Sequence, residues 1–245
     1  MIDLFQGKYI PYLATEIMEH SATATAAAAA ANGNGDGSSD DALAAALRRG
    51  GLAIGDGWVD PQAIVGTYPS FAFAHGLVGA AQRDAMAANV SRFDAALAAA
   101  DFRAATDIEH AVERFVEDTA GVNAYDVRHL GPYNFSAAGA YLARDDVRAA
   151  LGIPAGRVWQ LSSAAVSAAL HDDVAKPASQ LIAPLLDAHG LRVLLYNGAP
   201  MMLHRCASAR HAFATRLPRS RPPPSSACLL CIRAAPTCTC YYCGD

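Results

Sequence analysis

The sequence predicts an α/β fold, and three observations support this prediction. Residues 51–55, GLAIG, form a short apolar run that ends in the turn-rich GDGWVDP, a pattern typical of a buried parallel strand. A second strand is predicted at residues 191–198, LRVLLYNG, where apolar and β-branched residues follow Gly190. The stretch between the two strands has a mostly helical pattern. Two strands joined in this way predict an α/β sheet that carries a helical cap at about residues 75–190.

Helices are predicted wherever apolar residues recur at helical spacing between the strands. In the segment 107–121 the apolar residues Ile108, Val112, Phe115 and Val116 are expected on one face, and Gly121 is expected to end the helix. The other predicted helical segments are residues 91–102, 136–153 and 176–190.

Residues 21–41 form a low-complexity insertion, in which a run of alanine is followed by Gly, Asn, Asp and Ser. This composition predicts a solvated loop. Four of its residues (Asn32, Asn34, Asp36 and Gly37) resemble the first half of a calcium-binding loop. Leu43 stands where that loop needs a bidentate Glu, so the plain loop is favoured.

Composition argues against several classes of protein. The 245-residue chain has a formal net charge of −4, which provides no basic field for nucleic acid or anionic lipid. The longest apolar tract, residues 22–31, is mostly alanine with two threonines, so no membrane span is expected. No signal-peptide pattern precedes the first predicted element, so for the chain as written the expected compartment is the cytoplasm or is left open.

The last 28 residues, 218–245, differ from the rest of the chain. Helical periodicity ends at Leu217, and the triple proline at 222–224 excludes a helix or a central strand, so a disordered tail is expected. Zinc binding is the weaker alternative, because the two CxxC pairs are separated by a short spacer with no predicted core around them. Its ligands would be Cys228, Cys231, Cys240 and Cys243.

Several segments, in order along the chain, resemble the serine carboxypeptidases, a family of α/β-hydrolase fold. GLAIGDGWVDP is similar to the family's G-I-A-I-G-N-G-x-x-D-P, with Asp56 in place of Asn, and SFAFAHGLV continues it. YNFSAAGAYLARDDVRAALGI and HDDVAKPASQLIAPLLDAHGLRVLLYNG resemble the later family segments that end in V-R-x-A-L-H-V and Y-N-G-Q-x-D. The likeness covers about residues 3–217. It implies one partial α/β-hydrolase domain, equivalent to the C-terminal half of the family domain, without its N-terminal strands.

The resemblance also assigns the catalytic positions. The family's nucleophile elbow, G-E-S-Y-G/A-G-K-Y-V-P, aligns with residues 2–11, and Leu4 then occupies the position of the Ser. Met201 occupies the position of the triad Asp, and no residue corresponds to the triad His. Leucine has no nucleophilic atom and a thioether cannot orient an imidazole. We therefore expect the chain alone to be inactive.

The family's chemistry is the release of C-terminal residues from peptides through an acyl-enzyme, which needs no cofactor. The groups that recognise the peptide's terminal carboxylate correspond mostly to positions upstream of Met1, and Asp3 is the one candidate within the chain. The resemblance implies a secretory, vacuolar, lysosomal or extracellular setting. The alternative function is a catalytically dead binding or interaction protein, because Leu4 is a substitution inside a recognisable elbow. Oligomeric state and residue preference are not predicted.

Two further patterns carry weaker predictions. Asn89 and Asn134 each begin an N-x-S sequon and are candidate glycosylation sites. His171 is followed by Asp172 and Asp173, the richest cluster of ionisable residues, but no nucleophile elbow lies near it. A solvated helical surface is therefore the favoured interpretation of that cluster.

Overall fold

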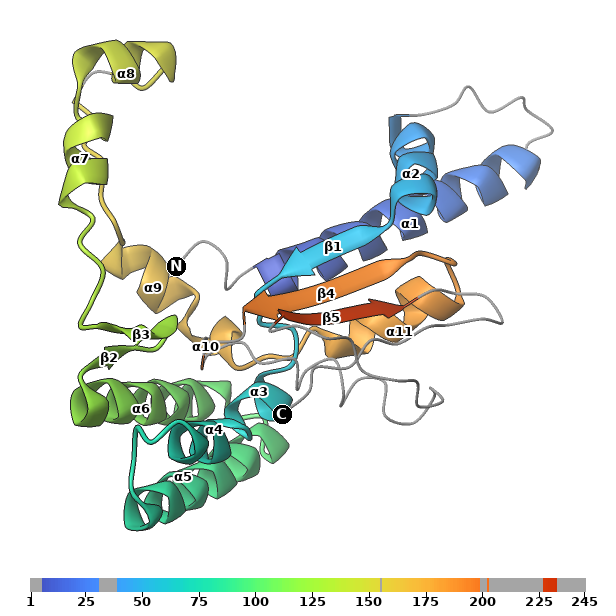
Figure 1. Cartoon of the computed structure of the whole chain (residues 1–245). Helices are drawn as coiled ribbons and strands as arrows, with labels where there is room; N and C mark the ends of the chain where they lie inside the picture. Colours follow the sequence, from blue (N-terminus) through green and yellow to red (C-terminus); the bar gives the residue numbers. More distant parts are fainter. Residues whose placement is uncertain (1–5, 31–38, 155, 199–201, 203–226, 233–245) are drawn as a thin grey trace.

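The computed structural model describes residues 6–30, 39–154, 156–198, 202 and 227–232 (Figure 1). The strands in these ranges are β1 (Leu52–Gly55), β2 (Val122–Asn123), β3 (Asp126–Leu130), β4 (Val193–Gly198) and β5 (Ala227–Ile232). The first six helices are α1 (Gln6–Ala30), α2 (Ser39–Gly50), α3 (Pro61–Val65), α4 (Tyr68–Ala74), α5 (Ala80–Ala98) and α6 (Phe102–Ala120). They are followed by α7 (Ser136–Leu142), α8 (Asp145–Ala150), α9 (Ala164–Ala169), α10 (His171–Val174) and α11 (Ser179–Asp187).

The two predicted strands pair with each other in parallel, as expected. Leu52 lies opposite Val193 and Gly55 lies opposite Tyr196, within a described sheet of order β1-β4-β5. A parallel pair requires a crossover connection, and here the helices from α3 to α11 provide it. The α/β fold class predicted from the sequence is confirmed.

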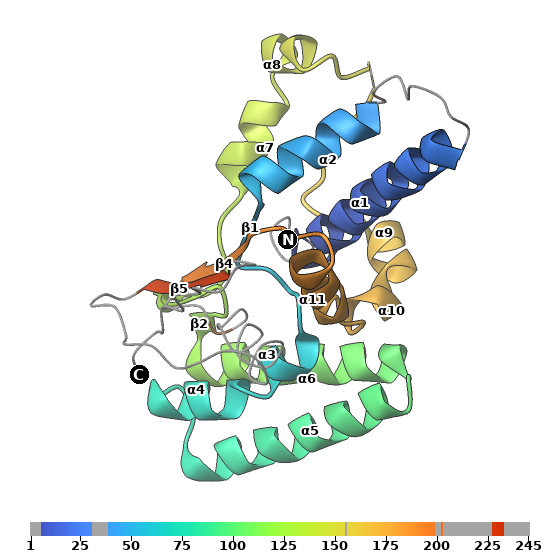
Figure 2. The same cartoon turned by 90° about the vertical axis from the view of Figure 1, so that its right-hand side faces the viewer.

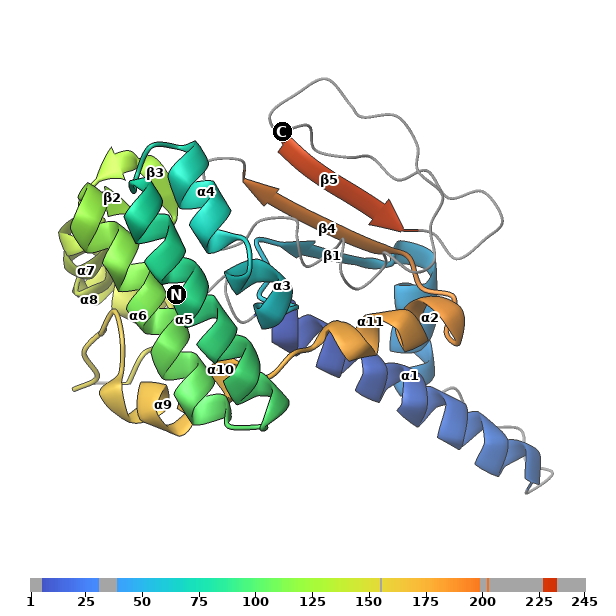
Figure 3. The ribbon, with the colours of Figure 1, turned by 90° about the horizontal axis from the view of Figure 1, so that it is seen from below.

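Two helices cover one face of this sheet. Because side chains alternate along a strand, Leu52, Ile54, Val193 and Leu195 all point to the same side, and all are buried there. Helices α1 and α11 pack against that side, as Figure 3 shows from below. Their buried contributions are Ala14, Met18, Ile182, Leu185 and Leu186.

A second core lies among the helices that follow β1. Helices α4, α5 and α6 pack together beyond the end of the sheet (Figures 2 and 3), and the largest side chains of this core are Trp58, Tyr68, Phe71 and Phe93. In α6 the predicted face is correct for Val112 and Val116, which are buried, and Ile108 packs beside them. It is wrong for Phe115, whose side chain is 38% exposed. Gly121 ends the helix with φ of 66°, as predicted.

The predicted solvated loop at residues 21–41 is wrong at both of its ends. Helix α1 continues through Ala30 and α2 begins at Ser39, because alanine has the highest helix propensity and an alanine run can extend an existing helix. The Ser21 hydroxyl donates to the Asp41 carboxylate at 2.7 Å and ties the two helices together. The four residues of the calcium-loop alternative lie outside the described residues.

The predicted disordered tail is wrong for residues 227–232. These residues form β5, which pairs antiparallel with β4 over its whole length, from Val193 opposite Ile232 to Gly198 opposite Ala227. The segment is the apolar run ACLLCI. Its backbone pairs with that of β4 on the edge opposite β1, which would otherwise be left unpaired. Cys228 and Cys231 thus belong to a strand, whereas Cys240 and Cys243 lie outside the described residues.

Helices α7, α8 and α9 contribute no buried residue to either core. Figure 1 shows α7 and α8 projecting away from the sheet and from the other helices. Several apolar side chains in this part of the chain are largely exposed, including Leu151 at 60%, Val158 at 78% and Leu161 at 56%. The predicted helical cap region is therefore mainly helical, but α7, α8 and α9 within it bury no residue in the described structure.

Candidate functional site

The carboxyl ends of β1 and β4 lie beside the first turn of α1 (Figure 1). Sites in α/β sheets form where parallel strands end, because loops and helix N-termini meet there. Helix α1 begins at Gln6, and β4 ends at Gly198. Leu4 and Met201, the residues expected at the positions of Ser and Asp, thus adjoin this edge in sequence but lie outside the described residues.

Two glycines allow α1 to approach the loop after β1 closely. A Cβ atom on Gly7 would lie 2.6 Å from the carbonyl carbon of Gly57 and 2.7 Å from that of Trp58. A Cβ atom on Gly57 would in turn lie 3.0 Å from the Cα atom of Gly7. Such distances leave no room for a side chain at either position, so this contact requires glycine. The first turn of α1 is held against the end of β1 by backbone-to-backbone packing.

The loop GDGWVDP is fixed mainly by structural contacts. The Trp58 indole N–H donates to the carbonyl oxygen of Val174 at 2.6 Å, and the Asp60 carboxylate caps α3 by accepting from the Ala63 N–H at 3.1 Å. Asp56 adopts φ of 47°, a left-handed conformation in which Asn and Asp are enriched. Hence this motif anchors the end of β1 to the helical region. Within it, Asp56 suits the left-handed turn and Asp60 caps α3.

Met202, four residues after the end of β4, is anchored as well. Met202 is fully buried, and its N–H donates to the carbonyl oxygen of Ala124 at 3.1 Å. Ala124 lies in the hairpin between β2 and β3, on the carboxyl side of α6. The chain next to Met201 is therefore attached to the helical region by one backbone hydrogen bond.

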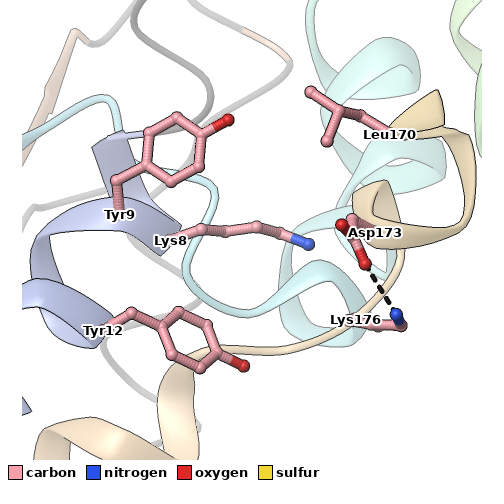
Figure 4. Close-up of a pocket in the computed structure, with 6 residues that line it drawn as sticks. All are labelled: Lys8, Tyr9, Tyr12, Leu170, Asp173 and Lys176. Carbon is pink, nitrogen blue, oxygen red and sulfur yellow. Dashed lines mark hydrogen bonds and ion pairs between the residues drawn. The ribbon is translucent and has the colours of Figure 1, made fainter. Parts of the chain in front are cut away.

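A pocket of about 350 Å³ opens between the start of α1 and the region of α10 (Figure 4). Its most unusual member is Lys8, whose side chain is 5% exposed and whose Nζ atom has no hydrogen-bond partner among the described residues. Burial lowers the pKa of Lys8 to about 8, although the nearby Asp173 carboxylate opposes this shift. Sequence reasoning missed this residue, because the alignment treats it only as part of the G-K-Y motif.

Comparison with known proteins assigns the family. The sequence model for the serine carboxypeptidases matches residues 3–215. The chain belongs to the serine carboxypeptidase family. This confirms the resemblance inferred from the motifs.

Relatives in this family share the sequence at low identity. The pheromone-processing carboxypeptidase kex1 of Aspergillus niger is 28% identical over 212 residues, which cover 79% of this chain and 32% of that protein. The serine carboxypeptidase S10 family member 1 of Dictyostelium discoideum is 29% identical over 161 residues, 63% of this chain and 38% of the relative. The chain thus spans about a third of the length of these relatives.

A solved structure supports the α/β-hydrolase fold. The crystal structure of the prohormone-processing carboxypeptidase Kex1 from Saccharomyces cerevisiae superposes with a TM-score of 0.64 at 20% sequence identity. The superposition covers 85% of this chain and 45% of the yeast chain. At this identity the likeness establishes the fold, and the residues of the site must be argued from this chain itself.

The remaining predicted site residues are scattered. Asp3 lies outside the described residues. Asn89 lies within α5, half-buried, and accepts a hydrogen bond from Arg92 at 3.1 Å, whereas Asn134 is exposed on the turn before α7 and accepts from the Ser136 N–H at 2.9 Å. An exposed turn is the usual setting of an accepted sequon, so the geometry favours Asn134 over Asn89.

The His171 cluster is more ordered than a solvated surface. The His171 side chain is 19% exposed, and its Nε2 atom lies 3.1 Å from the carboxylate of Asp107 on α6. The Asp172 carboxylate lies 3.6 Å from Nδ1 and also pairs with Arg103 at 3.1 Å. These contacts join α10 to α6, so the cluster has a packing role.

Two features are absent from the described residues. No group of three or more His, Cys, Asp or Glu residues there is arranged to hold a metal ion. Likewise, none of the described helices has both the length and the apolarity needed to cross a membrane.

Proposed function

We propose that this protein derives from a peptidase that releases C-terminal residues from peptides, and that the chain itself does not carry out this hydrolysis. The observation that carries the proposal is Leu4, which occupies the nucleophile position two residues before α1 begins. The side chain of leucine has only carbon and hydrogen atoms, so no acyl-enzyme ester can form on it.

The other catalytic positions support the same conclusion. Met201 takes the place of the Asp that would orient the catalytic imidazole, and no residue aligns with the His itself. Restoring one member of a catalytic triad leaves the others absent, and such residues act as a unit. A Leu4→Ser substitution alone is therefore not expected to create activity.

The test is a hydrolysis assay on the purified 245-residue chain. A dipeptide blocked at its N-terminus is incubated with the wild-type chain, with Leu4→Ser and with an intact kex1-type relative, and release of the C-terminal amino acid is measured. We expect release only by the relative. Release by the wild-type chain that a serine-directed inhibitor abolishes would refute the proposal.

A binding or interaction protein is the second candidate. It is favoured by the close approach of the first turn of α1, three residues after Leu4 in the sequence, to the loop after β1, where Gly7 lies against Gly57. A sequence that no longer has any function does not have to keep this contact between α1 and β1, whereas a binding surface at this edge of the sheet depends on it. Equilibrium binding of a blocked peptide without turnover would support this function, and absence of both would count against it.

The family's secretory setting is the proposed compartment of the parent protein. The exposed turn at Asn134 is compatible with glycosylation there. Expression of the chain behind a secretory leader, followed by glycosidase treatment, would test this: a mass decrease lost in Asn134→Gln supports the site, and no decrease refutes it.

A further inference from the structure

The pocket between α1 and α10 has the chemistry of an anion site. Lys8, Tyr9 and Tyr12 of α1 form one side, and Leu170, Asp173 and Lys176 form the other. Figure 4 shows the Lys8 side chain extending between the two tyrosine rings with its amine directed into the pocket, toward Asp173. These are also the only two lysines of the chain, since residues 8 and 176 are the only positions at which lysine occurs.

The charges of the pocket do not cancel. The Asp173 carboxylate accepts a hydrogen bond from the Lys176 amine at 2.6 Å, so this pair is internally neutral. The Lys8 amine is buried and makes no hydrogen bond in the described structure. A buried ammonium that lacks a partner is unfavourable, and an anion placed against it removes that cost. One positive charge is thus available to a ligand.

The walls restrict which anion fits. Leu170 and the rings of Tyr9 and Tyr12 provide apolar surface next to the single charge. A phosphate dianion would leave one negative charge uncompensated close to Asp173, whereas a carboxylate carries one charge and can bear an apolar group. We propose that Lys8 anchors a small organic carboxylate whose apolar or aromatic group packs against Leu170 and the pocket-facing surfaces of the Tyr9 and Tyr12 rings.

The proposed carboxylate site uses none of the triad positions, so it does not depend on hydrolytic chemistry. If no carboxylate binds at Lys8, the proposed loss of hydrolysis still stands. If the chain hydrolyses peptides, the proposed carboxylate site still stands. The carboxylate could belong to a free acid or to the end of a peptide, and the choice of probes separates these sources.

The experiment measures binding of 3-phenylpropanoate to the full chain by calorimetry at pH 7. The controls are 3-phenylpropanamide, which has the same shape without charge, and inorganic phosphate. We expect the carboxylate to bind at least tenfold more tightly than either control. N-acetylphenylalanine is the peptide-like probe, and its affinity relative to 3-phenylpropanoate identifies which of the two sources the pocket prefers.

Variants then locate the site. Lys8→Met keeps the length and the apolar stem of the side chain but removes its charge, and we expect it to weaken carboxylate binding at least tenfold. Arg144→Met removes one surface charge in the α7–α8 region, outside the pocket, and should leave binding unchanged. Because Lys8→Met removes a buried unpaired amine, it should melt no lower than the wild type, so lost binding would not reflect lost folding.

The pH dependence of carboxylate affinity gives a second test of the site, on the wild-type chain. Lys8 has a pKa of about 8, so binding should weaken about tenfold from pH 7 to pH 9 as the amine loses its proton. The other ionisable groups of the pocket are Asp173, Lys176, Tyr9 and Tyr12. The hydrogen bond to Asp173 raises the pKa of Lys176, which therefore stays charged over this range.

Nuclear magnetic resonance of chain labelled with ¹⁵N-lysine resolves the two amines, and saturation with 3-phenylpropanoate should raise the titration midpoint of Lys8 alone. The proposal is overturned if the amide binds as tightly as the carboxylate, if phosphate binds more tightly, if Lys8→Met binds normally, or if the Lys8 titration does not respond to the ligand.

Discussion

Three glutamates lie one helical turn apart on α6, and the last of them contacts the β2–β3 hairpin. Glu109 is 4% exposed and accepts from the Tyr68 hydroxyl at 3.5 Å, and Glu117 accepts from the Ala124 N–H at 3.1 Å. Glu113 lies between them. Burial raises the pKa of Glu109 well above its ordinary value, and burial together with the charge of Glu117 raises that of Glu113 to about 7. The folded chain thus holds protons on α6 that the unfolded chain releases.

We predict that the chain is more stable at pH 5 than at pH 8. An acid whose folded pKa exceeds its unfolded pKa stabilises the fold fully below the unfolded value and loses that contribution as pH rises through the folded value. For Glu113 the window runs from about 4.5 to about 7. Allowing for its partial exposure, we expect a loss of about 1–2 kcal/mol across the window, read as a drop in Tm of a few degrees.

The matched variants isolate this effect. Glu113→Gln should reduce the difference between pH 5 and pH 8 and leave the part due to Glu109, whereas Glu16→Gln, at a side chain that is 68% exposed, should leave the whole difference intact. His110 acts in the opposite direction, because burial lowers its pKa, and comparing variant with wild type cancels its contribution. Equal pH dependence in all three proteins would contradict the assignment.

At the residue scale, the sequence was informative only where a motif fixed the register. Alignment to the elbow matches Leu4 to the family's serine, and the strand ending in Y-N-G matches Met201 to its aspartate, and both matches remain predictions. The same alignment could not reveal that Lys8 is unpaired, because its isolation depends on burial and on Lys176 already neutralising Asp173. Pairing of this kind is created by tertiary packing and leaves no local signal.

At the element scale, the contact between α1 and the end of β1 depends on two glycines. We predict that Gly7→Ala destabilises the chain by about 1–3 kcal/mol, because its Cβ atom would overlap the backbone of Gly57 and Trp58, which cannot rotate away. Gly50→Ala is the matched control, since a Cβ atom there meets nothing within 4 Å. It should be neutral or slightly stabilising in a chemical denaturation series. Equal stability of the two variants would show that α1 does not pack as described.

The elements with strong patterns could be predicted, and those with ambiguous composition could not. The strand at Leu52–Gly55, the strand at Val193–Gly198 and the end of α6 at Gly121 follow from apolar runs and glycine stops. The alanine run has little hydrophobic drive, which favours a loop, yet its high helix propensity extends α1 once Ala14 and Met18 anchor the helix on the sheet. Strand β5 was missed because its partner, β4, is distant in sequence.

At the scale of the whole molecule, only one face of the sheet is covered in the described structure. Leu52 and Ile54 are buried beneath α1 and α11, but Ala53 is exposed and Tyr196 is 46% exposed on the opposite face. No strand among the described residues pairs with the outer edge of β1. Open edges and apolar faces favour association between chains.

We therefore predict that the purified chain self-associates. Sedimentation velocity should show a weight-average mass that rises with concentration, and Tyr196→Lys, which places a charge on the open face, should reduce this rise. A monomer at every concentration tested, together with a cooperative thermal transition, would contradict the prediction.

The central claim is that a serine carboxypeptidase-family fold is present here without its covalent chemistry. Treatment of the purified chain with a serine-reactive fluorophosphonate, followed by intact-mass and peptide mass spectrometry, tests it most directly. The intact kex1-type relative should gain one adduct on one serine. We predict that this chain gains none, because the motif alignment proposed above matches Leu4 to the nucleophilic serine. Stoichiometric labelling of a unique serine in the folded chain would contradict the account.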